Sequence, residues 1–367
     1  MDEDYSVFIP SPLPPAPALD LSGLFPLIDE ANGLLGRLDT AITTLADPGV
    51  ISYMYVRREA LLSSQIEGTQ SSFDDLMRFE NDQMPGVPLE DVEEVSSYVA
   101  AMNHGLKRLG EGFPLSLRLI REIHRVLLKN ARGERKNPGE FRTSQNWIGG
   151  TRPGKAKFVP PPPENLMELL GDLEKFLYDD KASLPLLVKA ALVHVQFETI
   201  HPFLDGNGRL GRLLIAFLLC HAGVLRAPTL YLSLYFKENR DEYYDLLQRV
   251  RLTGDWEAWL HFFLNGVIET CRDGLAKMQK IEALLTEDMS ALTALGRSRA
   301  TAEKVLSVLK RRPIANVRTL TECLTISKPT ATLALRNLEK LNIVEEITGG
   351  RYGKTYAYSA YIKLLGD

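Results

Sequence analysis

Twelve consecutive residues, 201–212, carry the side chains best suited to chemistry in this chain of 367 residues. They combine a general base, a carboxylate ligand for a hard metal, a glycine-rich turn and two cations: His201, Asp205, Gly206-Asn207-Gly208, Arg209 and Arg212. Apolar residues then recur at helical spacing from Leu210 to Leu218, which predicts a turn running into a helix. A helix N-terminus offers unpaired N–H groups and the positive end of the dipole, and both favour phosphate. The neutral imidazole of His201, just before this turn, could accept a proton from a hydroxyl that attacks phosphorus.

This stretch resembles the signature of the Fic (Fic/DOC) family, His-Pro-Phe-x-Asp/Glu-Gly-Asn-Gly-Arg-x-x-Arg, and departs from it nowhere. The resemblance implies that His201 deprotonates a Ser, Thr or Tyr hydroxyl of a protein. It implies that Asp205 holds the Mg²⁺ that bridges the phosphates of ATP. It also assigns ATP binding to the turn and the first helical residues: Gly206, Asn207, Gly208, Arg209, Leu210, Gly211 and Arg212. The structural alternatives are a core histidine and an ordinary Asp-Gly turn.

A second polar group lies upstream, between Ser63 and Gly68. Apolar residues predict a helix over 50–67 that Gly68 terminates, so Glu67 lies where a carboxylate opposes the helix dipole. A charge in that place indicates a cationic partner elsewhere in the fold. The segment resembles the Fic inhibitory motif Ser/Thr-x-x-x-Glu-Gly/Asn, with Ser63 one turn before Glu67. The resemblance implies that Glu67 pairs with Arg212 and displaces the γ-phosphate of ATP; a solvent-exposed glutamate is the alternative.

Residues 147–158 surround a Pro-Gly turn and predict a short β-hairpin. Its position is similar to that of the Fic flap, which implies that a protein substrate docks on it by backbone pairing. A plain surface hairpin is the alternative. Most aromatic residues between Tyr231 and Tyr244 are expected in the core, and Tyr244 is predicted to contact the adenine.

The remaining pattern predicts a mainly α protein with a Fic-type helical core and a small C-terminal domain. Five prolines in residues 10–17 indicate an extended strap, with a ligand for a proline-binding module as the alternative. The predicted domains are a proline-rich strap and first helix at 1–49, a catalytic core at 50–280, a helical connector at 281–295 and a winged helix-turn-helix domain at 296–367. The last domain is predicted from three helices followed by two strands, over 343–347 and 352–358.

Charge divides near the predicted boundary. From Gly296 onward there are 13 basic and 6 acidic residues, a net charge of +7, whereas the rest of the chain carries −11. The third helix of this part carries side chains suited to contacts with DNA bases: Thr330, Thr332, Arg336, Asn337 and Lys340. Side chains suited to phosphate contacts lie around it: Arg318, Arg351 and Lys354. Winged helices also serve as dimerisation or protein-docking modules, so DNA binding is one of two interpretations.

The overall composition, with 45% hydrophobic and 25% charged residues, is ordinary for a globular protein. The sequence has no apolar run long enough for a membrane span, and its acidic start is unlike a signal peptide. Three scattered cysteines, Cys220, Cys271 and Cys323, form no disulfide or zinc pattern and are expected to be buried. A cytoplasmic location is therefore expected.

The prediction that follows is a protein adenylyltransferase that moves AMP from ATP to a protein hydroxyl, with Glu67 as its inhibitor. Self-modification and a homodimer are compatible with it. One alternative is a nucleotide-sensing transcriptional regulator that binds DNA. Another is an enzyme whose net reaction removes AMP, with Glu67 aligning water. The sequence names neither the target nor the signal that relieves inhibition.

Overall fold

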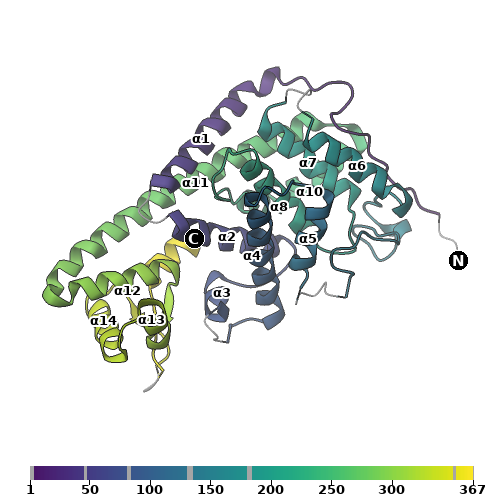
Figure 1. The fold of residues 1–367 in the computed structure, drawn as a ribbon. Coiled ribbons are helices and arrows are strands. Elements are labelled where there is room, and N and C mark those ends of the chain that lie inside the picture. Colours follow the sequence, from purple (N-terminus) through teal and green to yellow (C-terminus); the bar gives the residue numbers. More distant parts are fainter. Residues whose placement is uncertain are drawn as a thin grey trace.

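The computed structural model describes residues 4–44, 48–80, 84–129, 135–179, 184–349 and 353–366. Over these ranges the chain is mainly helical, with one small sheet near its C-terminal end (Figure 1). The mainly α class predicted from the sequence is confirmed. Within the described ranges, no helix combines the length and the apolar character that crossing a membrane requires.

The helices are α1 Phe25–Thr44, α2 Pro48–Ile66, α3 Phe73–Glu80, α4 Leu89–Gly110, α5 Leu117–Leu127, α6 Leu166–Leu177, α7 Leu186–Ile200, α8 Asn207–His221, α9 Ser233–Glu238, α10 Arg240–Thr253, α11 Trp256–Ala291, α12 Arg299–Arg311, α13 Val317–Leu324, α14 Lys328–Lys340 and α15 Ser359–Gly366. Four short 3-10 helices accompany them: η1 Ser22–Leu24, η2 Pro153–Lys155, η3 Pro163–Asn165 and η4 Leu292–Ser298. The strands β1 Ile314–Asn316, β2 Glu345–Glu346 and β3 Thr355–Ala357 form an antiparallel sheet in the order β1-β3-β2. In its register, Ile314 and Glu345 both lie opposite Ala357.

Helices α7 and α8 form the centre of the core. The sequence of α7 is apolar on nearly all sides, and every residue from Ala190 to Ile200 is buried, as expected for a helix surrounded by protein. Helix α8 packs along α7, and α4, α5, α6, α10 and α11 pack around this pair. Residues 201–206, which join the two helices, are therefore held between rigid, buried elements.

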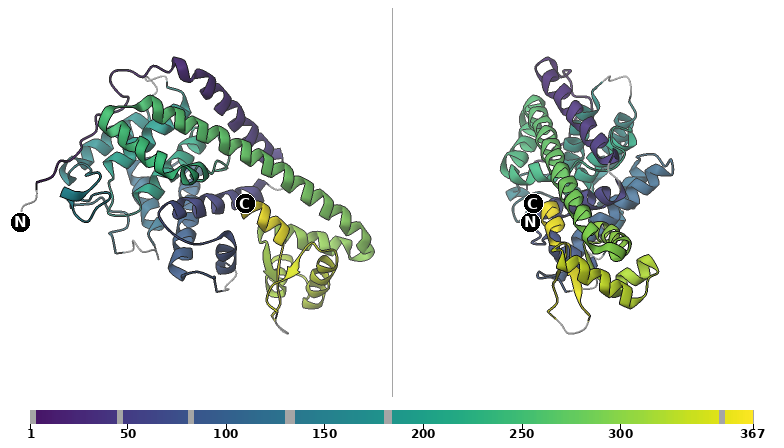
Figure 2. Two further views of the ribbon diagram at one scale, coloured as in Figure 1. Left: turned by 180° about the vertical axis from the view of Figure 1, so that it is seen from behind. Right: turned by 90° about the vertical axis from the view of Figure 1, so that its left-hand side faces the viewer.

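Helix α11 is the longest of the described helices, and α1 runs alongside it (Figures 1 and 2). It carries the chain out of the core without a break as far as Ala291. The predicted connector at 281–295 is therefore the end of α11 followed by η4. The C-terminal elements gather at the far end of α11, and α15 returns from them to pack against α2, α3 and α11 (Figure 2).

The C-terminal part contains the predicted helices as α12, α13 and α14, and the predicted strands in shorter form as β2 and β3. The strand β1 and the helix α15 were not predicted. Strand β1 has three residues, too few for an alternating pattern to be recognised. The predicted start of the last strand, Tyr352, lies outside the described residues. The designation as a winged helix remains a prediction.

The expectation that all three cysteines are buried was wrong for Cys323. Cys271 is buried and Cys220 is partly buried, whereas Cys323 is exposed. Cys323 lies on the short helix α13, where Leu320 is the one buried residue and Cys323 lies on the exposed face together with Arg318 and Glu322. All three thiols are free.

Close packing of α4 against α8 depends on Gly105. A methyl group at this position would overlap the ring of Phe217. We expect Gly105→Ala to lower the free energy of unfolding by about 1–3 kcal/mol, because the added methyl forces the buried helices apart. Gly110→Ala, on the same helix, is the control: nothing lies within 4 Å of the added methyl there. Urea denaturation measures both variants, and equal stability of the two would contradict this account of the packing.

Candidate active site

The signature residues lie where α7 ends and α8 begins. His201 caps α7 in the left-handed conformation, with φ 50° and ψ 59°, so the chain leaves the helix sharply. Gly206 precedes α8 with φ 76°, which glycine adopts without strain. The first N–H groups of α8 lack acceptors within the helix, as at any helix N-terminus. The predicted turn into a helix N-terminus is present.

The side chain of Asn207 holds this turn together. It is buried; its amide nitrogen donates to the Phe203 carbonyl at 2.8 Å, and its oxygen accepts from the Phe203 N–H at 2.9 Å. Both ends of the amide are thus used within the loop. The contribution of Asn207 to anion binding is then limited to its main-chain N–H at the start of α8.

His124, which sequence reasoning missed, supports the same loop from α5. Its Nδ1 accepts from the Gly139 N–H at 2.8 Å, so the proton lies on Nε2, which donates to the Asp205 carbonyl at 2.9 Å. Its ring stacks on Phe203 with centroids 3.7 Å apart. No motif surrounds His124, and a helical histidine among apolar residues gives no signal of this role.

Arg142 is a second residue that the sequence reasoning missed. Its buried guanidinium donates to the carbonyl oxygens of His201 at 3.0 Å, Ser144 at 3.2 Å and Pro161 at 2.5 Å. Burial lowers the pKa of Arg142 to about 10. Asn146 donates to the Phe203 carbonyl at 2.9 Å. The segment that precedes the predicted flap is therefore bonded directly to the loop that carries His201.

Arg212 lies one turn into α8 and is almost completely buried, with 3% of its surface exposed. It donates to Ser63 twice, to the hydroxyl at 2.8 Å and to the carbonyl at 3.0 Å. It also forms an ion pair with Glu67, with Nη2 and Oε1 2.6 Å apart. The structure thus brings Ser63 and Glu67 together with Arg212, the second arginine of the signature. Glu67 and Arg212 are 145 residues apart in the sequence.

Gly208 makes room for this ion pair. A side chain there would overlap the Glu67 carboxylate and come within 3.2 Å of the Arg212 guanidinium. Glu67 therefore lies directly over the first turn of α8, where an anion would bind. The Glu67 side chain is 35% exposed, and its partial desolvation alone would raise its pKa, but Arg212, Arg209 and His201 outweigh this and hold the pKa of Glu67 below its usual value. Glu67 is thus ionised at neutral pH.

Helix α2 ends one residue earlier than predicted, at Ile66, and begins at Pro48 instead of residue 50. The Glu67 N–H bonds to the Ser64 carbonyl at 3.0 Å, which is the tight pattern of a final 3-10 turn. Gly68 follows with φ 106°. Glu67 therefore belongs to the turn after the helix, because the chain tightens there before glycine reverses its direction.

Glu59 anchors α2 within the core. Its carboxylate accepts from the Ser233 hydroxyl and N–H of α9 and from the Tyr98 hydroxyl of α4, the last at 3.1 Å. Burial raises the pKa of Glu59 to about 7, although Ser233 and Arg212 oppose the rise. These bonds fix the helix from which Ser63 and Glu67 reach Arg212.

Arg209 takes a different direction from Arg212. It is buried, pairs with Glu94 of α4 at 2.9 Å, and reaches the Asp205 carboxylate at 3.3 Å. Sequence reasoning missed Glu94, because an acidic residue within a helix gives no sign of a partner on another helix. The predicted binding of ATP by Arg209 would require this side chain to act from its paired position.

Three other predicted ATP contacts lie in different settings. The Leu210 side chain is fully buried in the core. A side chain at Gly211 would overlap Glu198 of α7, so this glycine permits close packing of the two central helices. Tyr244 is 39% exposed, while the neighbouring Tyr243 is buried and bonded to His194 at 2.9 Å. Of this tyrosine pair, Tyr244 is the one whose ring can reach a ligand.

The short hairpin predicted at 147–158 is present in a minimal form. Ile148 and Phe158 form an isolated antiparallel bridge, with N–H to carbonyl distances of 2.8 and 3.2 Å, and η2 occupies the turn. The proline-rich strap lies beside it, since the Phe8 N–H donates to the Val159 carbonyl at 3.0 Å. The strap then crosses α7, where Gln196 donates to the Ser11 carbonyl at 2.9 Å.

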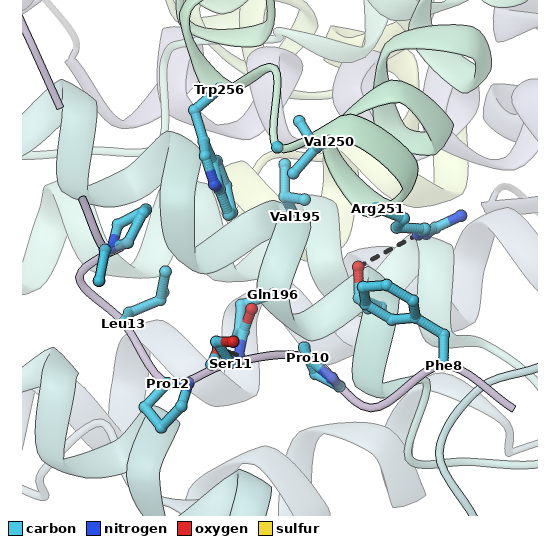
Figure 3. Close-up of a pocket in the computed structure, with 14 residues that line it drawn as sticks. Phe8, Pro10, Ser11, Pro12, Leu13, Val195, Gln196, Val250, Arg251 and Trp256 are labelled. Carbon is cyan, nitrogen blue, oxygen red and sulfur yellow. Dashed lines mark hydrogen bonds between the residues drawn. The ribbon is translucent and has the colours of Figure 1, made fainter. Parts of the chain in front are cut away.

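A cavity of about 220 Å³ lies between this strap and the helices α7 and α10 (Figure 3). Arg251 borders it and donates to the Thr199 hydroxyl at 3.2 Å and to the Glu198 carbonyl at 3.3 Å. Its guanidinium also lies over the Phe158 ring, 4.0 Å from the centroid. Arg251 thus connects the C-terminal end of α7, next to His201, with the base of the hairpin.

Asp205 is the one predicted metal ligand, and its side chain is 38% exposed. No group of three or more His, Cys, Asp or Glu residues suited to a metal occurs among the described residues. A single accessible carboxylate beside an anion-binding helix N-terminus fits Mg²⁺, which takes one or two carboxylates together with phosphate oxygens. The residues present would therefore hold the ion jointly with a nucleotide.

The DNA-contact candidates lie on and around α14. Arg336 and Lys340 are exposed, Thr330 and Thr332 are partly exposed, and Arg318 of α13 is paired with Glu322. Arg351 lies outside the described residues. Those that the structure describes belong to α13 and α14, which are remote from the loop 201–206 in sequence.

His124 should make the protein sensitive to acid. Burial lowers the pKa of His124 to about 4 from an ordinary 6.5, although its bond to Asp205 opposes this. The unfolded chain therefore binds this proton below pH 6.5, and the folded chain only near pH 4. His124 therefore lowers the free energy of unfolding by about 3 kcal/mol as the pH falls from above 6.5 to 4.

The substitution His124→Asn keeps an acceptor for Gly139 and removes the titrating ring. We expect its unfolding free energy to fall less steeply between pH 6.5 and 4 than that of the unchanged protein, measured by urea denaturation at each pH. The other buried groups titrate in both proteins, so they cancel in the comparison. Parallel pH curves for the two proteins would show that His124 does not carry this effect.

Comparison with known proteins adds to this geometry. The model described as "Fic/DOC family N-terminal" matches residues 25–107, and the model described as "Fic/DOC family" matches residues 114–219, so together they cover about half of the chain. The "Protein adenylyltransferase Fic" of Aedes aegypti is 35% identical over 182 residues, and the "Protein adenylyltransferase fic-1" of Caenorhabditis briggsae is 31% identical over 182 residues. Each match covers 49% of this chain but only 33% of the relative, about a third of its length.

Solved structures of other proteins share the fold of this chain. A Fic family protein from Desulfovibrio desulfuricans G20 superposes with a TM-score of 0.57 at 19% identity, covering 90% of this chain and 95% of that one. Fic-1 from C. elegans superposes with a TM-score of 0.54 at 23% identity, covering 71% and 74%. At these identities the structures are informative about the fold alone. Given the matching family models, the common helical fold and the complete signature on the loop between α7 and α8, this chain belongs to the Fic/DOC family.

Proposed function

We propose that this protein is an adenylyltransferase that transfers AMP from ATP to a hydroxyl group of a protein. The observation that carries the proposal is the position of the buried Arg212 in the first turns of α8, just past the loop that carries His201. A cation, a helix N-terminus and a base together suit phosphoryl chemistry. The relatives that bear the name protein adenylyltransferase support the same activity.

In the proposed reaction, the hydroxyl oxygen of the target attacks the α-phosphorus of ATP. The bond from that phosphorus to the bridging oxygen breaks, and pyrophosphate leaves. Nδ1 of His201 lies 3.3 Å from the Glu198 carbonyl, which can only accept, so the ring proton belongs on Nδ1. Nε2 is then unprotonated and takes the hydroxyl proton.

The other site residues bind and orient the nucleotide. The N–H groups of the first turn of α8 receive phosphate oxygens, and Arg212 is the cation for the terminal phosphate. Tyr244 supplies an exposed ring for the adenine. Asp205 would hold Mg²⁺, which supplies charge neutralisation on the phosphates when bound.

Glu67 is the proposed inhibitor, since its carboxylate is already paired with Arg212, the cation that the terminal phosphate would bind. The support is the 2.6 Å ion pair with Arg212 and the position of the carboxylate over Gly208. A phosphate cannot take the same place without repulsion from this ionised group. ATP then binds in a pose in which its α-phosphorus is not aligned with the attacking hydroxyl.

The hairpin at 147–158 is the proposed docking site for the target. Its single backbone bridge leaves main-chain groups available for an added strand, and Arg142 and Asn146 join its base to the loop of His201. A peptide held there would present its hydroxyl to His201. Backbone pairing is tolerant of sequence, so the target itself is not specified.

We expect Glu67→Gly to increase self-labelling by α-labelled ATP at least tenfold, because Arg212 becomes available to the terminal phosphate. The control is the double variant Glu67→Gly with His201→Ala, which keeps the phosphate-binding groups but lacks the base. Loss of a general base costs about 10²–10⁴ in rate, so the double variant should not label measurably.

Nucleotide binding by the double variant, measured by calorimetry, shows that its site is still formed. If the unchanged protein and Glu67→Gly label equally at saturating ATP, Glu67 is not an inhibitor. If Glu67→Gly retains full labelling without His201, this histidine is not the base. The absence of labelling in Glu67→Gly, with every protein substrate offered, would contradict the proposed activity.

A further inference from the structure

Glu198 is a buried carboxylate one turn before His201 on α7. It is 6% exposed, and its Oε1 has no hydrogen-bond partner among the described residues. Its Oε2 lies 4.0 Å from Nδ1 of His201. Keeping a carboxyl group in the core without a full set of partners is unfavourable. The position of Glu198 beside the proposed base His201 therefore indicates a role in the site.

The packing of α8 is adapted to this carboxylate. A side chain at Gly211 would overlap Oε1 of Glu198, so glycine within a helix is what allows the two central helices to enclose it. Glycine is unfavourable in a helix interior, but at position 211 it leaves the space that the Glu198 carboxylate needs. Gly211 thus contributes to the site through Glu198, in addition to any contact with the nucleotide.

The charge around His201 explains the need for a carboxylate. Burial and the two cations Arg251 and Arg142 lower the pKa of His201 to about 4, although Glu67 opposes this. A base of such low pKa holds a proton poorly at neutral pH. Two carboxylates lie near the ring, Glu67 and Glu198, and Glu67 must give up its position when ATP binds productively. Glu198 is then the carboxylate that remains beside the imidazole.

We propose that Glu198 is a positioning residue that holds the Nδ1 side of His201 and stabilises the imidazolium formed when Nε2 takes the proton of the target hydroxyl. The proposal rests on the proposed function of His201 as base. In this step the proton moves from the hydroxyl to Nε2, the imidazole becomes positively charged, and the ionised Glu198 balances that charge across 4.0 Å.

The ionisation of Glu198 gives the proposal a pH signature. Burial raises the pKa of Glu198 to about 7; Arg212 and Arg251 oppose the rise, and Glu67 adds to it. The other titratable groups near it are His194 and His201 on its own helix, and Tyr243 of α10, whose pKa is raised by burial and by Glu198 itself. Activity should therefore rise with pH as Glu198 becomes the carboxylate that the imidazolium needs. In Glu67→Gly, which lacks the contribution of Glu67, this rise should lie at lower pH than in the unchanged protein.

The test uses the full chain with Glu67→Gly, with and without Glu198→Gln, which keeps the shape of the side chain and removes its charge. We expect kcat at pH 8 to fall about 10- to 100-fold with KM for ATP within twofold, and the rise of activity with pH to disappear. Glu59→Gln is the matched control. It removes another buried carboxylate with a pKa of about 7 but should keep the rise. An unchanged kcat and pH profile in Glu198→Gln would overturn the proposal.

A second measurement needs no catalysis. In Glu67→Gly, the NMR resonances of the His201 ring, assigned by their loss in His201→Ala, should shift as Glu198 titrates. They should lose that shift in Glu198→Gln. If the shift occurs but Glu67→Gly does not label, the proposed function fails while the pairing of Glu198 with His201 stands. If labelling occurs but the His201 resonances do not respond to Glu198, the pairing is overturned and the function stands.

Discussion

The burial of Arg212 is the constraint on which the site depends. A guanidinium with 3% exposure needs a negative partner, because a lone charge in the core is strongly disfavoured. In this structure the partner is Glu67, which reaches Arg212 from the turn after α2. In the proposed reaction, the terminal phosphate of ATP takes the place of this carboxylate. The proposed inhibition is therefore a competition between the carboxylate and the nucleotide for one cation.

The position of α2 decides which partner Arg212 has. Glu59 bonds α2 to α9 and α4, and Ser63 contributes two bonds to Arg212, so the helix remains attached even when Glu67 turns away. Under the proposed inhibition, release requires only that the turn at Glu67 and Gly68 move while the helix stays in place. On its other side, α2 contacts α12 and α15 of the C-terminal part. The C-terminal part is therefore in physical contact with the helix that precedes Glu67.

Sequence and structure agree where the information is local. The residues from His201 to Arg212 are contiguous, and their glycines and helical spacing define a turn and a helix N-terminus without any knowledge of the fold. The pairing of Glu67 with Arg212 was predicted from a resemblance, and the structure places these side chains together.

The supporting residues could not be predicted, because each comes from a different helix or loop. His124 on α5, Arg142 before the hairpin and Glu94 on α4 have ordinary sequence surroundings, and only tertiary packing brings them to the loop. In the sequence, Glu198 is one polar residue in an otherwise apolar helix. Only the structure shows that Gly211 of α8 packs directly against its carboxylate. The end of α2 was misplaced by one residue because the final turn tightens before Gly68.

The competition for Arg212 is tested most directly by the affinities of ATP and AMP for the protein with and without Glu67→Gln, measured by calorimetry. AMP has no terminal phosphate to reach Arg212, so its affinity should be nearly the same in both proteins. ATP should bind the variant about tenfold more tightly, a gain of ~1.4 kcal/mol from one charge-assisted contact. If Glu67→Gln leaves the ratio of ATP to AMP affinity unchanged, the carboxylate and the phosphate do not compete for Arg212, and the account is wrong.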